Sequence, residues 1–558
     1  MNFLQTKLAL YMLGSVLAVV SGTVSANEAN SSTFSEPFDN RVVFLEQGWD
    51  DVMRAMFYQT TQGSRMLPYD WFLKLEQAHR RQKLSAPSNM RKMGFLVDGR
   101  SKTNPDGLPV GFAKDVDLVK GDSVGLTCAA CHTGELERHG KKVRIDGGQS
   151  MGDLEQLQNG ILTSLTATLT DDKKFRRFSD NVIGKWASDD ARYGLVKKME
   201  SYRDWWKARI ERSKGLTPHG PSRTDAFTII TNEITCRALA IPVNCAPAVA
   251  PNQFPFLWDT PDFEWVQYNS SVHNPLGRNV GEVTGVYAEM EISADGSISS
   301  SANINNLYDL EELLKELRAP AWPEDLFGKI DTTLADQGEV IFDAKCVSCH
   351  TEDPQPRSEP NKFGITFAKV HFDTPLSVLK TDPTAALSFA TRRAFPGAFL
   401  SKATALGVVG ADGKAPVAAL ANISGSSVIT EFFTNGNLLR TPIEYLGFRE
   451  SRSPSLAQLT TYKARPLNGV AFTAPYLHNG SVASIYELLL PAAERLKKFY
   501  VGSKQFDPVY LGFSTRRQSN SVLLDTTALG NGNFGHEFGT DLNHDERMAV
   551  IEYIKTLK

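Results

Sequence analysis

The pentads Cys128-Ala-Ala-Cys131-His132 and Cys346-Val-Ser-Cys349-His350 decide how the rest of this 558-residue chain is interpreted. C-x-x-C-H is the attachment sequence of c-type haem: both cysteines form thioethers, and the histidine binds the iron from the proximal side. A zinc site built from two C-x-x-C halves would leave both adjacent histidines unexplained. The chain has only 6 cysteines and 10 histidines, so two accidental pentads would be rare. The sequence therefore predicts two covalently bound haem c groups.

The residues before the second pentad predict a helix. Gly338, Phe342 and Cys346 are spaced four apart, which places them on one helical face. This pattern resembles the N-terminal helix of class I cytochromes c, in which the glycine allows a close crossing by the C-terminal helix. Residues 545–557 have the amphipathic pattern suited to that crossing. We therefore expect residues 326–558 to form a C-terminal cytochrome c domain.

The N-terminus has the pattern of a signal peptide, residues 1–26. Lys7 precedes an apolar run over residues 8–20, and Val24-Ser-Ala offers the small residues of a cleavage site. An uncleaved anchor is the alternative, although the run is short for a span of roughly 20 residues. We expect export to the periplasm or out of the cell, with no membrane span after cleavage. Residues 27–325 would then form the N-terminal haem domain, with insertions.

Composition predicts a fold class and excludes some partners. The net charge of -3 argues against binding to nucleic acid. The 42 glycines and 28 prolines favour many turns. Helical periodicity over residues 178–210 and 307–317, with short hairpins near 135–147 and 284–302, predicts a mostly α fold with extensive loops and short β-hairpins. The two pentads would make it a pair of cytochrome c-like haem domains packed together.

The remaining cysteines, Cys236 and Cys245, lie nine positions apart in a proline-containing segment. In an oxidising exported compartment, a disulfide is the default interpretation, and two free buried thiols are the alternative. Either way the pair is structural. A bound Ca²⁺ is also compatible with the chain, but no EF-hand-like spacing assigns its ligands.

The sixth iron ligand decides the function of a haem, because a filled position favours electron transfer and an open one admits a small molecule. No methionine lies between His350 and Met548, so the usual methionine ligand is missing. Histidine candidates for the second haem are His371, His478, His536 and His544. His478 lies in a turn bounded by proline and glycine, whereas the others fit surface loops. We therefore predict His478 as the distal ligand, which makes this haem a relay.

The first haem has no comparable partner in the sequence. His139 follows His132 closely, in a charged hairpin pattern that predicts a solvent-exposed side chain. Met151 and Met199 remain candidates. We expect an open or water-ligated iron at this haem.

Taken together, the motifs resemble the bacterial di-haem cytochrome c peroxidase superfamily, specifically its rubber oxygenase-like branch. The pieces that carry the resemblance are Phe57-Tyr-Gln-Thr-Thr-Gln-Gly-Ser-Arg, Pro68-Tyr-Asp-Trp-Phe, Cys128-Ala-Ala-Cys-His-Thr-Gly, Arg144-Ile-Asp-Gly-Gly, Pro255-Phe-Leu-Trp-Asp-Thr-Pro, Arg278-Asn-Val-Gly-Glu-Val, Ala464-Arg-Pro-Leu-Asn-Gly, Tyr476-Leu-His-Asn-Gly-Ser and Phe499-Tyr-Val-Gly-Ser. In the peroxidases proper, methionine typically stands where Leu477 stands here. The rubber oxygenase-like branch uses the next residue, His478.

The resemblance implies that the N-terminal haem is the reactive one and takes peroxide or dioxygen. Electrons would come from a redox partner protein or a small electron donor, by way of the C-terminal haem. A phenylalanine near the distal face is needed in the rubber oxygenases, and the matching neighbourhood is Phe254-Pro-Phe256-Leu-Trp258. Trp258 is a candidate for electron passage or for packing alone. The alternative function is a pure electron carrier with both irons six-coordinate.

Overall fold

The computed structural model describes residues 42–352, 357–368, 370–436, 438–449 and 454–558. The predicted signal peptide, residues 1–26, lies outside the described residues. Within the described ranges, no helix is long and apolar enough to cross a membrane.

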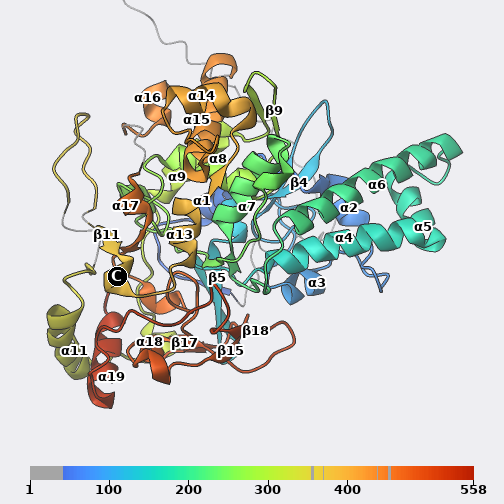
Figure 1. The fold of residues 1–558 in the computed structure, drawn as a ribbon. Helices are drawn as coiled ribbons and strands as arrows, with labels where there is room; N and C mark the ends of the chain where they lie inside the picture. Colours follow the sequence, from blue (N-terminus) through green and yellow to red (C-terminus); the bar gives the residue numbers. More distant parts are fainter. Residues whose placement is uncertain (1–41, 353–356, 369, 437, 450–453) are drawn as a thin grey trace, which may run out of the picture.

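Helices and small sheets are joined by long loops (Figure 1). The longer helices are α1 (Asp51–Gln59), α4 (Leu154–Thr170), α5 (Asp172–Val182), α6 (Asp189–Arg212), α7 (Ala226–Asn232), α8 (Pro275–Gly285), α9 (Ile304–Leu314), α11 (Thr332–Lys345), α13 (Thr384–Thr391), α15 (Val417–Asn435) and α19 (His544–Ile554). The larger sheets have the strand orders β1 (Val42–Phe44)–β6 (Lys141–Asp146)–β5 (Thr133–Arg138) and β2 (Leu67–Pro68)–β4 (Ser123–Leu126)–β3 (Phe112–Asp115). Two-stranded pairs include β9 (Met290–Ile292) with β10 (Ile298–Ser300), β11 (His371–Pro375) with β14 (Thr461–Ala464), and β15 (Lys498–Val501) with β18 (Val522–Asp525).

Both predicted hairpins are present. Strands β5 and β6 pair antiparallel directly after the first pentad, and β1 adds to β6 in parallel. His139 lies at the tip of this hairpin, where it is exposed and has a left-handed φ of 49°. The prediction of a solvent-exposed His139 is therefore confirmed. The second hairpin pairs β9 with β10.

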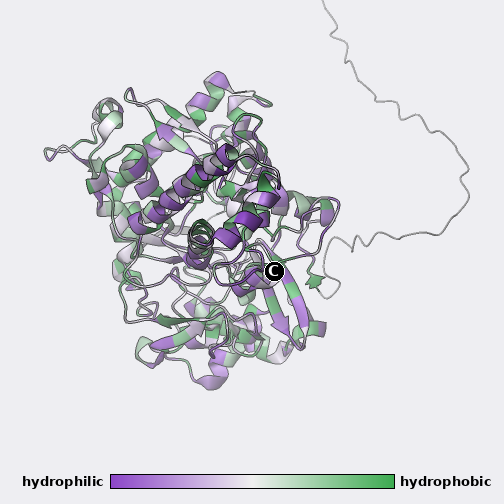
Figure 2. Cartoon of the chain, turned by 90° about the vertical axis from the view of Figure 1, so that its right-hand side faces the viewer, coloured by the Kyte–Doolittle hydropathy of each residue, from purple (hydrophilic) through white to green (hydrophobic). Residues whose placement is uncertain are grey.

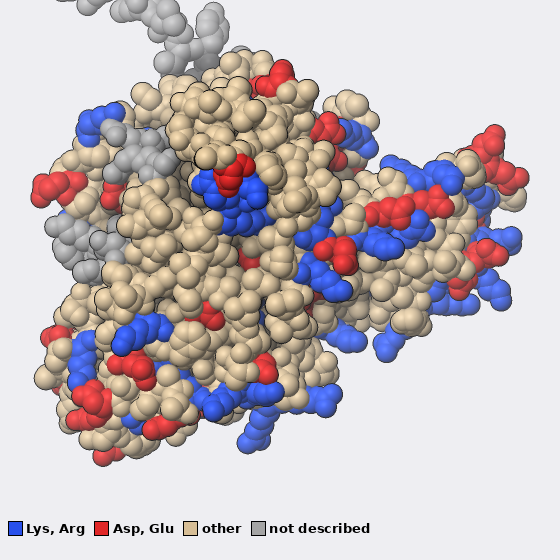
Figure 3. All heavy atoms as spheres, viewed as in Figure 1, with Lys and Arg blue, Asp and Glu red and all other residues tan. Residues whose placement is uncertain are grey.

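Helices α4, α5 and α6 form an arm that projects from the rest of the molecule (Figure 1). The periodicity over residues 178–210 correctly predicted helix, although Gly184 and the cap of α6 at Ser188 divide it into two. Figure 3 shows lysine and arginine alternating with acidic residues along the arm. Figure 2 shows hydrophilic and hydrophobic positions interleaved on its helices. These mixed surfaces give the arm no single charge character.

The apolar core crosses the predicted boundary at residues 325 and 326. One cluster of buried side chains includes Trp49 and Val143 from the first half together with Phe342, Phe472 and Leu557 from the second. The two halves therefore pack through a common core. Their division into two cytochrome c-like domains stays a prediction.

The predicted helix before the second pentad is α11, and α19 crosses it. A Cβ added to Gly338 would meet the carbonyl oxygen of Ala549 and the side chain of Tyr553. Asn543 and Glu546 form a capping box that fixes the start of α19. The predicted close crossing at Gly338 is confirmed.

Cys236 and Cys245 form a disulfide, as predicted. The bridge closes the segment that follows α7. This segment contributes Ile234 to the wall of a cavity of about 1120 Å³.

We predict that Gly338→Ala lowers the free energy of unfolding by roughly 1–3 kcal/mol, because the added methyl group overpacks the crossing of α11 and α19. Thermal unfolding followed by circular dichroism measures the change. Gly194→Ala in α6 is the matched control, since open space surrounds Gly194 and alanine favours a helix. Equal stability of the two variants would contradict the role of Gly338.

Candidate functional site

Both pentads fold into the same turn. In the first, the backbone N–H groups of Cys131 and His132 donate to the carbonyl of Cys128, at 3.2 and 3.0 Å. In the second, Cys349 and His350 donate to the carbonyl of Cys346, at 3.0 and 2.9 Å. This turn brings two cysteines and one histidine together on a short stretch of chain, as attachment of a haem requires.

A backbone carbonyl orients the imidazole of each pentad. Nδ1 of His132 lies 2.7 Å from the carbonyl oxygen of Pro255, and Nδ1 of His350 lies 2.8 Å from that of Arg465. A carbonyl only accepts, so Nδ1 carries the proton and the lone pair is left on Nε2. Burial lowers the pKa of His132 to about 4, which keeps its ring neutral at pH 7. Both rings therefore present Nε2 to a metal, held by a hydrogen bond typical of metal-binding histidines.

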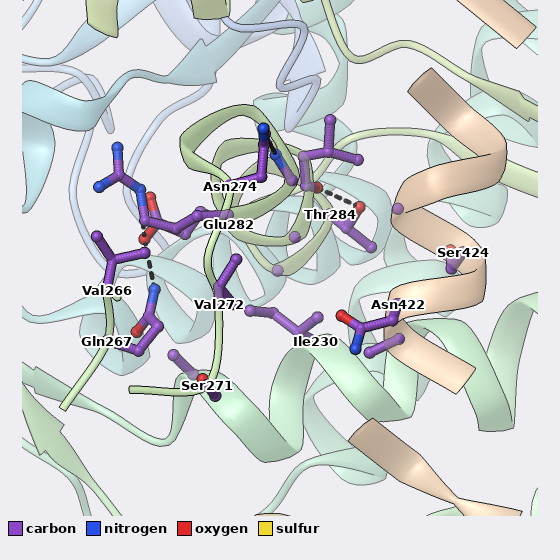
Figure 4. A pocket seen from close by; sticks show the side chains of 18 of the residues that line it. Ile230, Val266, Gln267, Ser271, Val272, Asn274, Glu282, Thr284, Asn422 and Ser424 are labelled. Carbon is purple, nitrogen blue, oxygen red and sulfur yellow. Dashed lines mark hydrogen bonds and ion pairs between the residues drawn. The ribbon is translucent and has the colours of Figure 1, made fainter. Parts of the chain in front are cut away.

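A cavity of about 1120 Å³ adjoins the first pentad. Cys128, Cys131 and His132 all line it. Its walls come from α7, α8 and α15 and from the loop of residues 266–274, as Figure 4 shows. Sites for drug-sized ligands measure roughly 300–1,000 Å³, so this cavity has room for a large cofactor and more.

One face of α8 leaves space for a flat group. Gly277, Gly281 and Gly285 are spaced four apart, so they share a helical face, and all three line the cavity. A Cβ added to Gly281 would meet nothing within 4 Å. The glycine face therefore borders open space at Gly281, where a planar macrocycle can lie, whereas a Cβ on Gly285 would meet the side chain of Ile230.

Two cations line the cavity without a counterion. Lys463 donates to the carbonyl of Trp265, and Arg465 donates to the carbonyls of Phe256 and Trp258. Neither forms an ion pair with a carboxylate of the described residues, and burial lowers the pKa of Lys463 well below its usual value. Buried cations need compensation, and the two propionates of a haem supply it. Cysteines, histidine, glycine face and cations together fit a haem at this site.

A carboxyl group faces the same cavity. Glu282 on α8 accepts a hydrogen bond from Nε2 of Gln267 at 2.9 Å (Figure 4). Burial raises its pKa above the ordinary range, although Arg278, at 3.8 Å, opposes the shift. Arg278 itself pairs with Glu311. Glu282 is thus a titratable group in a largely apolar cavity. It is the glutamate of the motif Arg278-Asn-Val-Gly-Glu-Val, for which the sequence predicted no role.

Of the predicted pocket residues Phe254, Phe256 and Trp258, Phe254 alone is among the described residues that line the cavity. Phe254 lines the cavity, with its ring centroid 6.4 Å from that of His132. Phe256 and Trp258 stack on each other at 4.4 Å, and the guanidinium of Arg465 covers Phe256. Because the Pro255 carbonyl binds Nδ1 of His132, this segment supports the histidine from the side opposite the iron-binding nitrogen.

The ring that the structure places near His350 is His536. Their ring centroids are 6.2 Å apart, and Nδ1 of His536 is buried with no hydrogen-bond partner among the described residues. An imidazole nitrogen binds a metal at about 2 Å, so two rings on opposite sides of one iron have centroids about 6 Å apart. Burial lowers the pKa of His536 to about 3, which keeps its ring neutral. The sequence analysis placed His536 in a surface loop, whereas the structure brings its ring close to that of His350.

The loop that carries His536 is held in place by Arg495. This buried arginine donates to the carbonyls of Asn533 and Gly535, both at 2.7 Å, and to that of His536 at 3.1 Å. Gly535 adopts a φ of 74° and lies tightly against Lys380. The signal that could have identified His536 is this glycine-bounded turn, which is the same signal that favoured His478.

His478 is buried as well, but it lies among tyrosines. Its ring stacks on Tyr462 at 4.1 Å and meets Tyr268 edge-on at 6.4 Å. Burial lowers the pKa of His478 to about 4. The assignment of His478 as distal ligand stays a prediction, and His536 is the competitor that the structure supplies.

The other candidates are spread over the molecule. His544 shares a hydrogen bond with Tyr486. Met151 and Met199 are buried, and Met199 belongs to an apolar cluster. The side chain of His371 lies outside the described residues. No cluster of three or more potential metal-binding side chains is found in the described part of the chain, so the structure adds no ligands for the suggested Ca²⁺.

Comparison with known proteins matches residues 461–500 to the family of RoxA-like, cytochrome c-like domains. The uncharacterized protein y4iJ of Sinorhizobium fredii is 31% identical over 93% of this chain and 94% of its own length. The uncharacterized protein y4iM of the same organism is 25% identical over 56% of this chain and 61% of its own. The chain therefore belongs to the family of y4iJ, and its matched segment makes it a RoxA-like cytochrome that binds haem c.

Proposed function

We propose that the protein is an exported di-haem oxidoreductase of the di-haem cytochrome c peroxidase superfamily. Dioxygen or peroxide would be reduced at the haem of Cys128, Cys131 and His132. The observation that carries this proposal is the cavity of about 1120 Å³ that opens beside His132. No methionine is among the described residues that line it, so the cavity supplies space for a small oxidant instead of the usual methionine ligand.

The second haem, bound by Cys346, Cys349 and His350, is proposed to relay electrons. The 6.2 Å separation of the His350 and His536 rings supports a site closed by two imidazoles. A filled sixth position favours electron transfer over ligand binding. An external electron donor, either a protein or a small molecule, would reduce this haem.

Glu282 is the acid–base group that we assign to the cavity. A haem supplies the redox chemistry when it is bound, whereas proton transfer must come from the protein. In its ionised form the carboxylate can accept a proton from hydrogen peroxide and return it to the departing oxygen. Gln267 holds the carboxylate in place through its hydrogen bond. The apolar walls around it, such as Ile230 and Val280, admit dioxygen equally well.

A pure electron carrier is the second candidate, and His273 is the observation that favours it. This buried histidine lines the same cavity, where it packs on Trp265 at 5.1 Å between ring centroids. If it bound the first iron, both haems would be closed. Carbon monoxide discriminates between the two functions, because it binds only an open ferrous haem.

We predict that the mature protein carries two haems by mass spectrometry and that its reduced form binds one equivalent of carbon monoxide. Cys128→Ser/Cys131→Ser removes one haem and the carbon monoxide band together. Cys346→Ser/Cys349→Ser is the matched variant, which removes one haem and retains the band. A purely low-spin spectrum without any carbon monoxide binding would exclude the oxidoreductase and favour the electron carrier.

We predict that His536→Ala converts the second haem from low-spin to high-spin, because its iron loses the distal imidazole. Electron paramagnetic resonance of the ferric protein measures the loss. His478→Ala is the control, since both histidines are buried and have lowered pKa values. If His478→Ala alone abolished the low-spin signal, His478 would be the ligand and the assignment of His536 would be wrong.

We predict that the rate constant for reaction with hydrogen peroxide rises with pH through the raised pKa of Glu282. Below that pKa the carboxyl is protonated and cannot accept a proton; above it the base is active. Glu282→Gln should remove this pH dependence and slow the reaction roughly 10²–10⁴-fold. Stopped-flow absorbance measures the rate, with Glu312→Gln on the surface of α9 as control. An unchanged profile in Glu282→Gln would show that the base lies elsewhere.

A further inference from the structure

The two pentad histidines are connected by a continuous set of bonds through one arginine. His132 donates from Nδ1 to the carbonyl of Pro255, and the next residue, Phe256, accepts from Nη1 of Arg465 at 2.7 Å. The backbone carbonyl of the same arginine accepts from Nδ1 of His350 at 2.8 Å. The only non-covalent steps along this route are three hydrogen bonds of ordinary length.

We propose that Arg465 is the positioning residue that couples the two haem sites, and that the route through Phe256 and Pro255 carries electrons between them. This inference rests on the proposed function in one respect, the presence of two haems. It assigns Arg465 two tasks: its backbone orients His350, and its side chain fixes the segment whose carbonyl orients His132.

The side chain of Arg465 is suited to this task. Its planar guanidinium binds two carbonyls at once, that of Phe256 and that of Trp258 at 3.1 Å. It also lies over the Phe256 ring, 3.6 Å from the centroid, which fixes the ring as well as the backbone. Lysine keeps the charge but cannot make this fork.

The segment that contains Arg465 and the segment that it binds are each anchored by a further backbone hydrogen bond. Leu467 donates its backbone N–H to the carbonyl of Thr351, directly after His350, at 3.0 Å. On the other side, Leu257 donates to the carbonyl of Gly147 at 2.9 Å. Strand β14 delivers Arg465 to this position, since the strand ends at Ala464. A shift of Arg465 would therefore move both histidine acceptors.

With both haems bound, one electron would cross the route in each step. The haem held by His350 would be oxidised by one electron, and the haem held by His132 would be reduced by one. Each Nδ1 proton would stay on its imidazole, and no bond would form or break. An external one-electron donor would then reduce the haem held by His350 again. Hydrogen bonds and covalent bonds couple donor and acceptor more strongly than empty space of the same length, which favours this route.

Arg465→Lys and Arg465→Gln, loaded with haem, test the proposal. Electron paramagnetic resonance and redox titration report on each haem separately, and neither readout requires turnover of peroxide or dioxygen. Photoreduction followed by transient absorbance measures electron transfer from the second haem to the first. Mass spectrometry counts the haems, so a chain that carries only one is recognised as a failure of the proposed function instead.

The expected result is a simultaneous change at both haems, with electron transfer slowed about 10-fold or more, the usual cost of losing a partner that orients a metal ligand. A variant that retains the circular dichroism spectrum but loses both haems together supports the coupling as well. A change confined to one haem, or an unchanged transfer rate, overturns it. If one of the two Arg465 variants loses its circular dichroism spectrum, the other variant is used to test the proposal. If both lose it while the controls fold, Arg465 is a general folding residue and the proposal fails.

Two variants serve as controls. Arg449→Lys removes a comparable fork, since Arg449 binds the carbonyls of Pro261, Phe263 and His273, which are outside the route. Arg392→Met removes a positive charge that binds Thr231, Asn232 and Asn244, none of which lines the cavity, while the carbonyls of Phe256 and Trp258 keep their donor. Both controls should leave the transfer rate within about 2-fold, below the loss expected for an orienting partner. A 10-fold loss in either control would show that losing any such guanidinium, or any positive charge, is enough to slow electron transfer.

Discussion

The hydrogen bond from a histidine Nδ1 to a backbone carbonyl is the constraint on which both pentads depend. It fixes the tautomer, so that the lone pair is always on Nε2, and it fixes the direction of the ring. A carboxylate acceptor would add a charge that burial penalises, whereas a carbonyl adds none. The acceptors, Pro255 and Arg465, are more than a hundred residues from the histidines they orient. The long loops must therefore be placed accurately before either site exists.

Buried basic side chains differ in whether a carboxylate of the protein neutralises them, and this difference distinguishes structural residues from candidate cofactor ligands. Arg144 is as buried as any residue in the core, and the carboxylates of Asp98 and Glu135 compensate it completely within the protein. Lys463 and Arg465 donate to carbonyl oxygens, and Arg465 also donates to the hydroxyl of Thr260, but neither forms an ion pair with a carboxylate among the described residues. An arrangement that leaves two adjacent cations uncompensated is costly unless an anion arrives. The propionates of haem are anions of the right number, so the protein completes its own electrostatics only when it is loaded.

Local patterns in the sequence predicted the local features well. The pentads, the helix that carries Gly338, the hairpin with His139 and the Cys236–Cys245 bridge all depend on neighbours within a few residues, and each is present. The distal partner of His350 stays a prediction, because two glycine-bounded turns in the C-terminal half each carry a histidine, His478 and His536. Which turn faces the second pentad depends on how Arg495 and Lys380 hold residues 533–536, and such tertiary contacts leave no periodic signal in the sequence.

Phe254, Phe256 and Trp258 show that the position of a residue near a site in the sequence does not determine what its side chain does there. The structure places Phe254 in the wall of the cavity, whereas Phe256 and Trp258 stack on each other and are not among its lining residues. The Pro255 carbonyl already occupies Nδ1 of His132, which puts the segment behind the imidazole. In the proposed function, oxidant chemistry takes place at the opposite wall, made by α7, α8 and α15, where Gly281 and Glu282 lie. The aromatic segment then has the proposed role of connecting the two pentads, because Arg465 contacts both the Phe256 carbonyl and His350.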